Sequence, residues 1–345
     1  SQAEQILEAK NYEGGCEMRG RQSFNPLEKM GLAYIDIDKK IKISSFGNYF
    51  LDENYDLGEI FFKSFLKWQY PNPDANKYNP KDGYNIKPFI ATLRLIKKVN
   101  NLCFQKKLKE KGVSKVEFAL FFVSLSNYEN IELTANKLIE FRLKYESKDK
   151  DEQEIYLTNY FKENFDEYES WENATEYTDN IIRYFRLTRY FYIRGNGWYI
   201  DLEPRRIIEI NALIENDNAS AKVFTSKDEY ISYLSDVNTP TLPWNNKDKL
   251  LEVIEYLISE IDNKINELNK LKISLPIKPD INLNSSDIEY LKSKSEEFRI
   301  YRRTLFQKEI HYNSQEIKNI EEYIILLQNI FNISKGRPVE LERVI

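Results

Sequence analysis

A helix, a short β-hairpin and a second helix follow one another twice along the chain, and this outline limits the possible fold more than any other feature. The clearer hairpin lies at residues 190–201. Its two aromatic and β-branched runs, 190–194 and 198–201, flank the turn Gly195-Asn196-Gly197. An Asn-Gly turn between two such runs is a strong signature of a tight antiparallel hairpin.

The other hairpin is predicted near the start of the chain. Apolar residues alternate with polar ones in segments 32–38 and 41–44, on both sides of the polar turn Lys39-Lys40. Helical periodicity surrounds both hairpins. Helix, hairpin and helix in this order is the outline of a winged helix.

The rest of the chain reads as helical. Gly and Pro are scarce, at 11 each, whereas the chain has 24 Tyr and 20 Phe, which is typical of a folded and mainly helical protein. We therefore expect a mainly α fold with small β-hairpins. Two winged-helix-like subdomains, 1–84 and 85–240, are expected to precede an α-helical linker domain, 241–345.

Several helix boundaries are predicted from capping signals. Asn25 is expected to cap a short helix over residues 24–31, with Pro26 in the first helical position. Ser114 and Glu117 have the spacing of a capping box. Asn173 is expected to cap a long helix that runs to Arg189. Two separate helices are expected at residues 286–309 and 314–332.

The sequence offers little that could form a catalytic centre. Its single histidine, His311, and its two cysteines exclude a histidine-based triad, a thiolate metal cluster and a disulfide framework. Asp280 followed by Glu316 and Lys318 superficially fits a Mg²⁺-dependent nuclease. Glu316 and Lys318 would point to different faces of a predicted helix, however, so this candidate is rejected. We expect no metal or cofactor in this chain. Without a signal peptide or a membrane span, the expected location is cytoplasmic.

The distribution of charge matters more than the net charge of −5. Residues 94–115 hold eight basic residues and one acidic residue, and residues 183–206 hold six arginines and two acidic residues. Residues 151–179 hold ten carboxylates. Local positive charge is what a phosphate-binding surface needs, because affinity comes from the release of condensed counterions. The alternative for any single run is a solvated helix face.

Several segments carry a resemblance to a known family. They are Phe65-Leu66-Lys67-Trp68-Gln69-Tyr70-Pro71, Asn85-Ile86-Lys87-Pro88-Phe89, Leu95-Ile96-Lys97-Lys98-Val99, Ser114-Lys115 with Ala119-Leu120-Phe121, Arg183-Tyr184-Phe185-Arg186-Leu187-Thr188 with Arg194-Gly195-Asn196, and Leu242-Pro243 with Lys247-Asp248-Lys249-Leu250-Leu251. On these segments the chain resembles the N-terminal recognition region of type IIS restriction and nicking endonucleases of the AlwI kind. The resemblance covers residues 14–260 well and the remainder loosely.

This resemblance implies a bacterial restriction–modification protein with GAGTC-type or GGATC-type specificity. In such enzymes winged-helix-like subdomains read an asymmetric site, and a helical linker leads to a C-terminal nuclease domain that requires Mg²⁺. The chain stops about where that nuclease would begin. We therefore expect a module that binds double-stranded DNA without cutting it, and we transfer no catalytic residue. A nuclease domain or a small nuclease subunit is the expected partner.

The candidate base-reading residues precede the helix ahead of each hairpin or occupy its N-terminal part. The first group is Arg19, Arg21, Ser23 and Asn25. The second group is Asn173, Thr175, Glu176 and Asn180. Arginine can read guanine, asparagine can read adenine and glutamate can accept from the cytosine amino group. The alternatives are a solvated loop for the first group and a simple helix cap for Asn173.

The remaining candidates are basic residues and one hairpin tip. Arg183 and Arg186 are expected to contact phosphates, the alternative being ion pairs with the acidic 151–179 stretch. Arg194 and Asn196 could touch the backbone or the minor groove, although Asn196 could simply make the turn. Lys97 and Lys98 are expected on a positioning surface that gives affinity without sequence information. The alternative to DNA recognition is a winged-helix module for protein–protein assembly, which the acidic pI favours.

Overall fold

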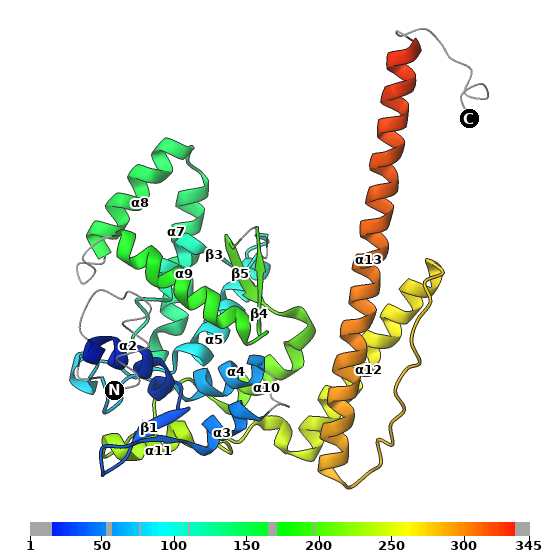
Figure 1. Cartoon of the computed structure of the whole chain (residues 1–345). Helices are drawn as coiled ribbons and strands as arrows, with labels where there is room; N and C mark the ends of the chain where they lie inside the picture. The colour runs from blue at the N-terminus through cyan, green and yellow to red at the C-terminus, as the bar shows by residue number, and fades with distance from the viewer. Residues whose placement is uncertain are drawn as a thin grey trace. The chain divides into compact units, whose positions relative to one another are not determined.

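The computed structural model describes residues 16–52, 57–75, 77–109, 111–164, 171–195 and 197–334. At residues 16–19, 21, 172 and 328–334 it describes the backbone alone. The chain divides into two compact units, Ser1–Leu242 and Pro243–Ile345 (Figure 1). The boundary expected at residue 84 would fall within the first unit and stays a prediction.

The described part of the chain is mainly helical with two small antiparallel sheets, as the sequence predicts. The elements of the first unit are α2 (Cys16–Lys29), β1 (Ala33–Ile35), β2 (Ile41–Ile43), α3 (Ser45–Leu51), α4 (Leu57–Lys67), η1 (Pro80–Asp82), α5 (Pro88–Gln105), β3 (Val113–Ser114), α6 (Lys115–Phe121), η2 (Tyr128–Asn130), α7 (Ile131–Glu146), α8 (Lys150–Asn164), α9 (Trp171–Leu187), β4 (Phe191–Arg194), β5 (Tyr199–Leu202), η3 (Pro204–Arg206), α10 (Ile207–Asn216) and α11 (Lys227–Ser235). The second unit contains η4 (Pro243–Asn245), α12 (Lys247–Lys270) and α13 (Ile288–Ser334). None of the described helices combines the length and the apolar character that crossing a bilayer requires.

The first hairpin forms as predicted, but the helix before it does not begin where expected. Strands β1 and β2 pair in antiparallel register, with Ile35 opposite Ile41. Helix α2 starts at Cys16, so Asn25 lies inside it and is not its cap, and Pro26 also lies inside the helix. Proline costs a helix one backbone hydrogen bond, and α2 tolerates that loss close to its C-terminal end.

The second hairpin belongs to a three-stranded sheet with the order β3-β5-β4. Strands β4 and β5 form the predicted hairpin, and the two-residue strand β3 joins its outer edge with Val113 opposite Ile200. Gly112 has a φ of +68°, and a Cβ there would collide with the carbonyl oxygen of Ile200. Glycine therefore allows β3 to approach β5 closely. The capping box of Ser114 and Glu117 starts α6 as predicted.

An aromatic core connects the second hairpin to the helices. Phe62 of α4 stacks on Tyr190 with ring centroids 4.3 Å apart, and Phe185 of α9 stacks on Phe191 of β4 at 5.2 Å. Phe89 of α5 meets Phe185 and Phe191 edge to face. Offset and edge-to-face aromatic pairs stabilise a core beyond the area that they bury. This packing holds α9 and the β4–β5 hairpin in one rigid arrangement.

A buried ion pair connects α6 with α7. Arg142 donates from Nε to Glu117 Oε1 over 2.6 Å and from Nη2 to the carbonyl oxygen of Gly112 over 2.6 Å. Burial alone would lower the pKa of Arg142, but hydrogen bonds and charge attraction from Glu117 outweigh it and raise that pKa. Because both charges are buried, removal of one would leave the other uncompensated. The pair therefore ties α7 to the start of α6.

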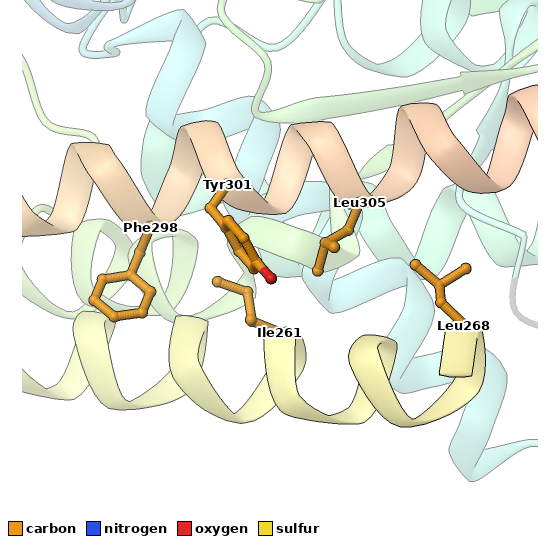
Figure 2. Packing of buried hydrophobic residues seen from close by; sticks show 5 residues of the cluster. All are labelled: Ile261, Leu268, Phe298, Tyr301 and Leu305. Carbon is orange, nitrogen blue, oxygen red and sulfur yellow. The ribbon is translucent and has the colours of Figure 1, made fainter. Parts of the chain in front are cut away.

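The second unit is built on a pair of long helices. Ile261 and Leu268 of α12 face Phe298, Tyr301 and Leu305 of α13 (Figure 2). The two helices expected at 286–309 and 314–332 are one continuous helix, α13. The segment between residues 309 and 314 was expected to separate them. Asn313 and Ser314 are compatible with a helix interior, and the Ser314 hydroxyl donates to the carbonyl oxygen of Ile310.

Candidate nucleic-acid interface

Helix α9 has one buried face and one exposed face. Its buried residues are Ala174, Thr178, Ile182 and Phe185. Its exposed residues include Glu176, Asn180, Arg183 and Leu187. Residues three and four positions apart share one side of a helix, so the exposed residues form a continuous stripe. The buried side packs against α4 and α6, which leaves the stripe turned outward.

Arg183 and Arg186 both remain exposed on α9. Among the residues that the structure describes, neither arginine has an ion-pair or hydrogen-bond partner, so the described part of the acidic 151–179 stretch does not occupy them. Lys115 of α6 instead pairs with Asp179 of that stretch, with Nζ 2.7 Å from Oδ1. Exposed arginines with their full hydrogen-bonding capacity can bind phosphate oxygens.

The turn of the β4–β5 hairpin lies beside this stripe. Trp198 donates its backbone N–H to Gly195 over 3.1 Å and accepts from the backbone N–H of Lys115 over 2.8 Å. Lys115 is also the residue that pairs with Asp179 of α9. One residue therefore connects the hairpin turn, the start of α6 and the middle of α9. The exposed stripe of α9 and the hairpin turn form one candidate surface.

The two residues predicted at the hairpin, Arg194 and Asn196, differ in what the structure describes of them. Arg194 is half-buried and forms an ion pair with Asp201 across the hairpin, with Nη2 and Oδ2 3.2 Å apart. Its guanidinium also lies over the Tyr192 ring, 5.8 Å from the centroid. Arg194 is therefore held against the hairpin by contacts within the protein. Asn196 lies outside the described residues.

Asn173 and Thr175 lie in the first turns of α9. Because α9 is helical from Trp171, Asn173 does not cap it, contrary to the sequence-based expectation. Both side chains are partly buried and both take part in interactions within the protein. Glu176 and Asn180 are exposed by comparison, so among the four predicted base readers these two present the most accessible polar groups.

The candidates ahead of the first hairpin lie on α2 and not in a loop. Ser23 and Asn25 are exposed on this helix. Arg19 and Arg21 are also on α2, and their side chains lie outside those described. A helix presents side chains at fixed intervals, so α2 offers a more ordered platform than the expected loop.

The basic stretch 94–115 separates into two parts with different environments. Lys97 donates to Asn211 Oδ1 over 2.7 Å, and Lys98 pairs with Glu132 at 2.6 Å. Both lysines are partly exposed and already have a partner within the protein, so their place on a positioning surface stays a prediction. Lys106 and Lys107, in the segment after α5, are exposed.

Lys115 and Trp198 were not among the predicted site residues. Trp198 is 50% exposed, which is unusual for a residue of its size. The sequence signal for Lys115 was its place directly after the capping residue Ser114, at the start of a helix. Nothing in the sequence indicated that Lys115 would meet residues 64 and 83 positions further along the chain.

The described residues do not fit a Mg²⁺ ion. Across the described ranges, no group of three or more His, Cys, Asp or Glu residues could hold a metal. A hard divalent cation requires several oxygen ligands at close range. We therefore derive no hydrolytic step from these residues.

Comparison with known proteins gives a family and a distant likeness to solved structures. The profile described as "AlwI restriction endonuclease" matches residues 28–344. No curated protein matches the chain. Among solved structures, the chain is similar to one titled "Crystal structure of pyrene- and phenanthrene-modified DNA in complex with the BpuJ1 endonuclease binding domain". That likeness has 16% sequence identity and a TM-score of 0.49, and it covers 68% of this chain and 83% of the other.

Proposed function

Because the chain belongs to the AlwI restriction endonuclease family, we propose that it is the double-stranded DNA recognition module of a type IIS restriction or nicking endonuclease. It binds a short asymmetric site, and a Mg²⁺-dependent nuclease domain or small nuclease subunit acts with it to cut. The observation that carries this proposal is the outward stripe of α9, with Asn180 and the unpaired Arg183, beside the β4–β5 turn.

The order of elements supports a winged helix in this part of the first unit. Helix α5, strand β3 and helix α6 come first, and helix α9 leads directly into the β4–β5 hairpin. The central position of β5 between β3 and β4 is the strand order of a winged helix. Helices α6 and α9 pack together as the two helices of a helix-turn-helix do, with α7 and α8 inserted between them.

In this arrangement α9 is the recognition helix. An exposed recognition helix enters the major groove, with side chains near its N-terminal part on base edges. Asn180 is suited to adenine, and Glu176 is suited to the amino group of cytosine. Arg183 and Arg186 follow toward the C-terminal part, where they are suited to phosphates. The β4–β5 turn then lies against the flanking backbone, where Arg194 and Asn196 are proposed to contact the backbone or the minor groove.

The other predicted residues have supporting roles in this proposal. Helix α2, with Arg19, Arg21, Ser23 and Asn25, precedes the β1–β2 hairpin and would read the remaining part of the site. Lys97 and Lys98 could reach phosphates only by giving up Asn211 and Glu132, so they are the weakest candidates. Asn173 and Thr175 are suited to orienting the start of α9.

Selection of bound duplexes from a randomised pool tests this function directly. We expect enrichment of one short asymmetric site, with binding that weakens as salt rises. Specific sites are commonly bound about 10³–10⁷-fold more tightly than random duplex. A pool without enrichment, bound no better than unselected duplex, would overturn the proposal and favour the assembly module instead.

A further inference from the structure

The β1–β2 hairpin exposes an apolar surface that the recognition helix does not explain. Ile35, Ile41 and Ile43 are 50%, 63% and 54% exposed, and Ile37 at the tip is completely exposed. Single exposed apolar residues are common, but a contiguous group on a protruding element usually marks a binding surface. The hairpin therefore needs a partner with an apolar interior.

The pairing of the two strands places these isoleucines on one face. Ile35 lies opposite Ile41, and Ala33 lies opposite Ile43. Directly opposite residues project to the same side of a sheet, so all four share a face. Ala33 is buried at the base of the hairpin, whereas Ile43 opposite it and the Ile35–Ile41 pair toward the tip are exposed. The apolar face is thus exposed along most of its length.

The hairpin is held rigidly at both ends. At its base, the Ser44 hydroxyl donates to the carbonyl oxygen of Gly31 over 2.6 Å, and its backbone N–H donates to Leu32 over 3.1 Å. At its tip, the Asp36 carboxylate accepts from the backbone N–H of Lys40 over 2.8 Å. Asp36 also exchanges backbone hydrogen bonds with Lys39 and Lys40. Ile37 is therefore presented outward on a well-ordered turn.

Basic residues surround the apolar tip. Lys39, Lys40 and Lys42 are all exposed, and Lys42 lies 3.7 Å from the Asp36 carboxylate. Asp38 is the exposed carboxylate beside them. An apolar tip with flanking lysines fits a partner that has an anionic rim and an apolar interior. The minor groove of duplex DNA has both, because phosphates border the stacked bases and sugars.

We propose that the β1–β2 hairpin is a minor-groove ribbon whose Ile37 side chain enters a base step as an apolar wedge. This inference rests on the proposed DNA-binding function and adds a second contact, separate from α9. Proteins that insert apolar side chains into the minor groove unstack one step and kink the duplex toward the major groove. Pyrimidine–purine steps deform most easily, so the hairpin favours such a step without hydrogen bonds to its bases.

The test compares variants of the full chain on one duplex selected from the randomised pool, with 2-aminopurine at successive positions. The Ile37→Ser variant should bind about tenfold more weakly, because an isoleucine side chain loses its burial. Its dependence on salt should stay unchanged, because no charge is removed. Wild type should increase the 2-aminopurine fluorescence at one base step. In Ile37→Ser this increase should disappear.

Charge variants of the same hairpin distinguish the contribution of the Ile37 wedge from that of the lysines around it. The double variant Lys39→Ala with Lys40→Ala should reduce the slope of log affinity against log salt by about two if both contact phosphates. It should leave the 2-aminopurine signal in place at saturating protein. Asp38→Asn should bind more tightly, because it removes a repulsive carboxylate from the rim.

Val223→Ser is the matched control, since Val223 is 91% exposed and lies outside the hairpin. It should behave as wild type. If wild type binds the selected duplex but Ile37→Ser keeps both its affinity and its fluorescence signal, the wedge is wrong while DNA recognition stands. If Ile37→Ser changes only self-association or binding to another protein, the hairpin is a protein-binding surface and the inference is overturned. If wild type selects no duplex at all, the proposed function fails and the inference fails with it.

Discussion

The exposed side chain of Arg183 leads to a specific prediction about DNA binding. It is exposed on α9, and within the described ranges no acidic residue neutralises it. Arg183→Ala should weaken binding to cognate and random duplexes alike and should lower the salt slope by about one unit. Gel-shift titrations at several salt concentrations measure both. Lys162→Ala, which removes an exposed charge from α8, is the control. An unchanged slope in Arg183→Ala would assign this arginine a role other than phosphate contact.

Glu176 should give the opposite pattern, because a base contact acts at one position of the site. Glu176→Gln keeps the size of the side chain but replaces an acceptor carboxylate with an amide. We expect relaxed discrimination at one base pair, worth about 1–3 kcal/mol, and little change on random duplex. Affinities for a set of single-base variants of the selected site measure this. Equal losses on all duplexes would exclude base reading by Glu176.

Lys67 makes stability depend on pH. It is completely buried, with Nζ donating to the carbonyl oxygens of Leu234 and Asp236 over 2.8 Å and 2.5 Å. Burial lowers its pKa to about 7 from an ordinary value near 10.5. Between these values the unfolded chain binds more protons than the folded chain, so the free energy of unfolding rises with pH.

Lys67→Met should remove this dependence. From pH 7 to pH 9 wild type should gain about 2 kcal/mol of unfolding free energy relative to Lys67→Met. Urea unfolding followed by far-UV circular dichroism at the two pH values measures the difference. The comparison stops at pH 9 because burial also raises the pKa of Tyr70, to about 12, and exposure of such tyrosines on unfolding would act in the opposite direction at higher pH. Parallel pH profiles for the two proteins would show that Lys67 titrates normally.

At the scale of single elements, local signals predicted structure wherever the determining contacts are local. The turn at 195–197, the alternation around Lys39-Lys40 and the capping box at Ser114 each involve residues a few positions apart, and all three elements form. The start of α2 was missed because Asn25-Pro26 resembles a helix start, whereas the helix continues through it. Strand β3 has two residues and exists through pairing with β5, so no local pattern could indicate it.

The candidate surface was predictable to the same extent. The exposed positions of α9 follow from its helical period, and the hairpin turn follows from its own sequence. The contact of Lys115 with Asp179 and Trp198 depends on tertiary packing between distant segments. Likewise, the charge run at 94–115 could not reveal that Lys97 and Lys98 have partners within the fold.

The close approach of β3 to β5 yields a test at the element scale. Gly112 and Gly83 both have positive φ, at +68° and +83°. A Cβ at Gly83 would meet nothing within 4 Å, whereas one at Gly112 would meet the backbone of Ile200. Alanine in the left-handed region costs about 1–2 kcal/mol at either position. Gly112→Ala should lose at least about 1 kcal/mol more, because β3 must move away from β5. Thermal unfolding of the two variants measures this, and equal losses would mean that the sheet accommodates the methyl group.

At the scale of the whole molecule, an acidic net charge is compatible with DNA binding because the charges are segregated. Among the described carboxylates of 151–179, four lie on α8, and Asp179, one helical turn before Arg183 on α9, is paired with Lys115. Interactions between exposed charges fade over a Debye length of about 8 Å at physiological salt. Local arginines can therefore bind phosphates while distant carboxylates reduce binding elsewhere on the protein.

The division into two units gives the last prediction. The exposed stripe of α9, the β4–β5 turn, α2 and the β1–β2 hairpin all belong to residues 1–242. This unit has its own aromatic core, and α12 and α13 of the second unit have theirs. A compact unit with its own core can fold alone. Residues 1–242 should therefore unfold cooperatively and bind the selected duplex within about twofold of the full chain, since every proposed DNA contact lies in this unit. Parallel titrations and unfolding curves of the two proteins check this. Retained folding with loss of site-specific binding would show that α12 or α13 takes part in recognition.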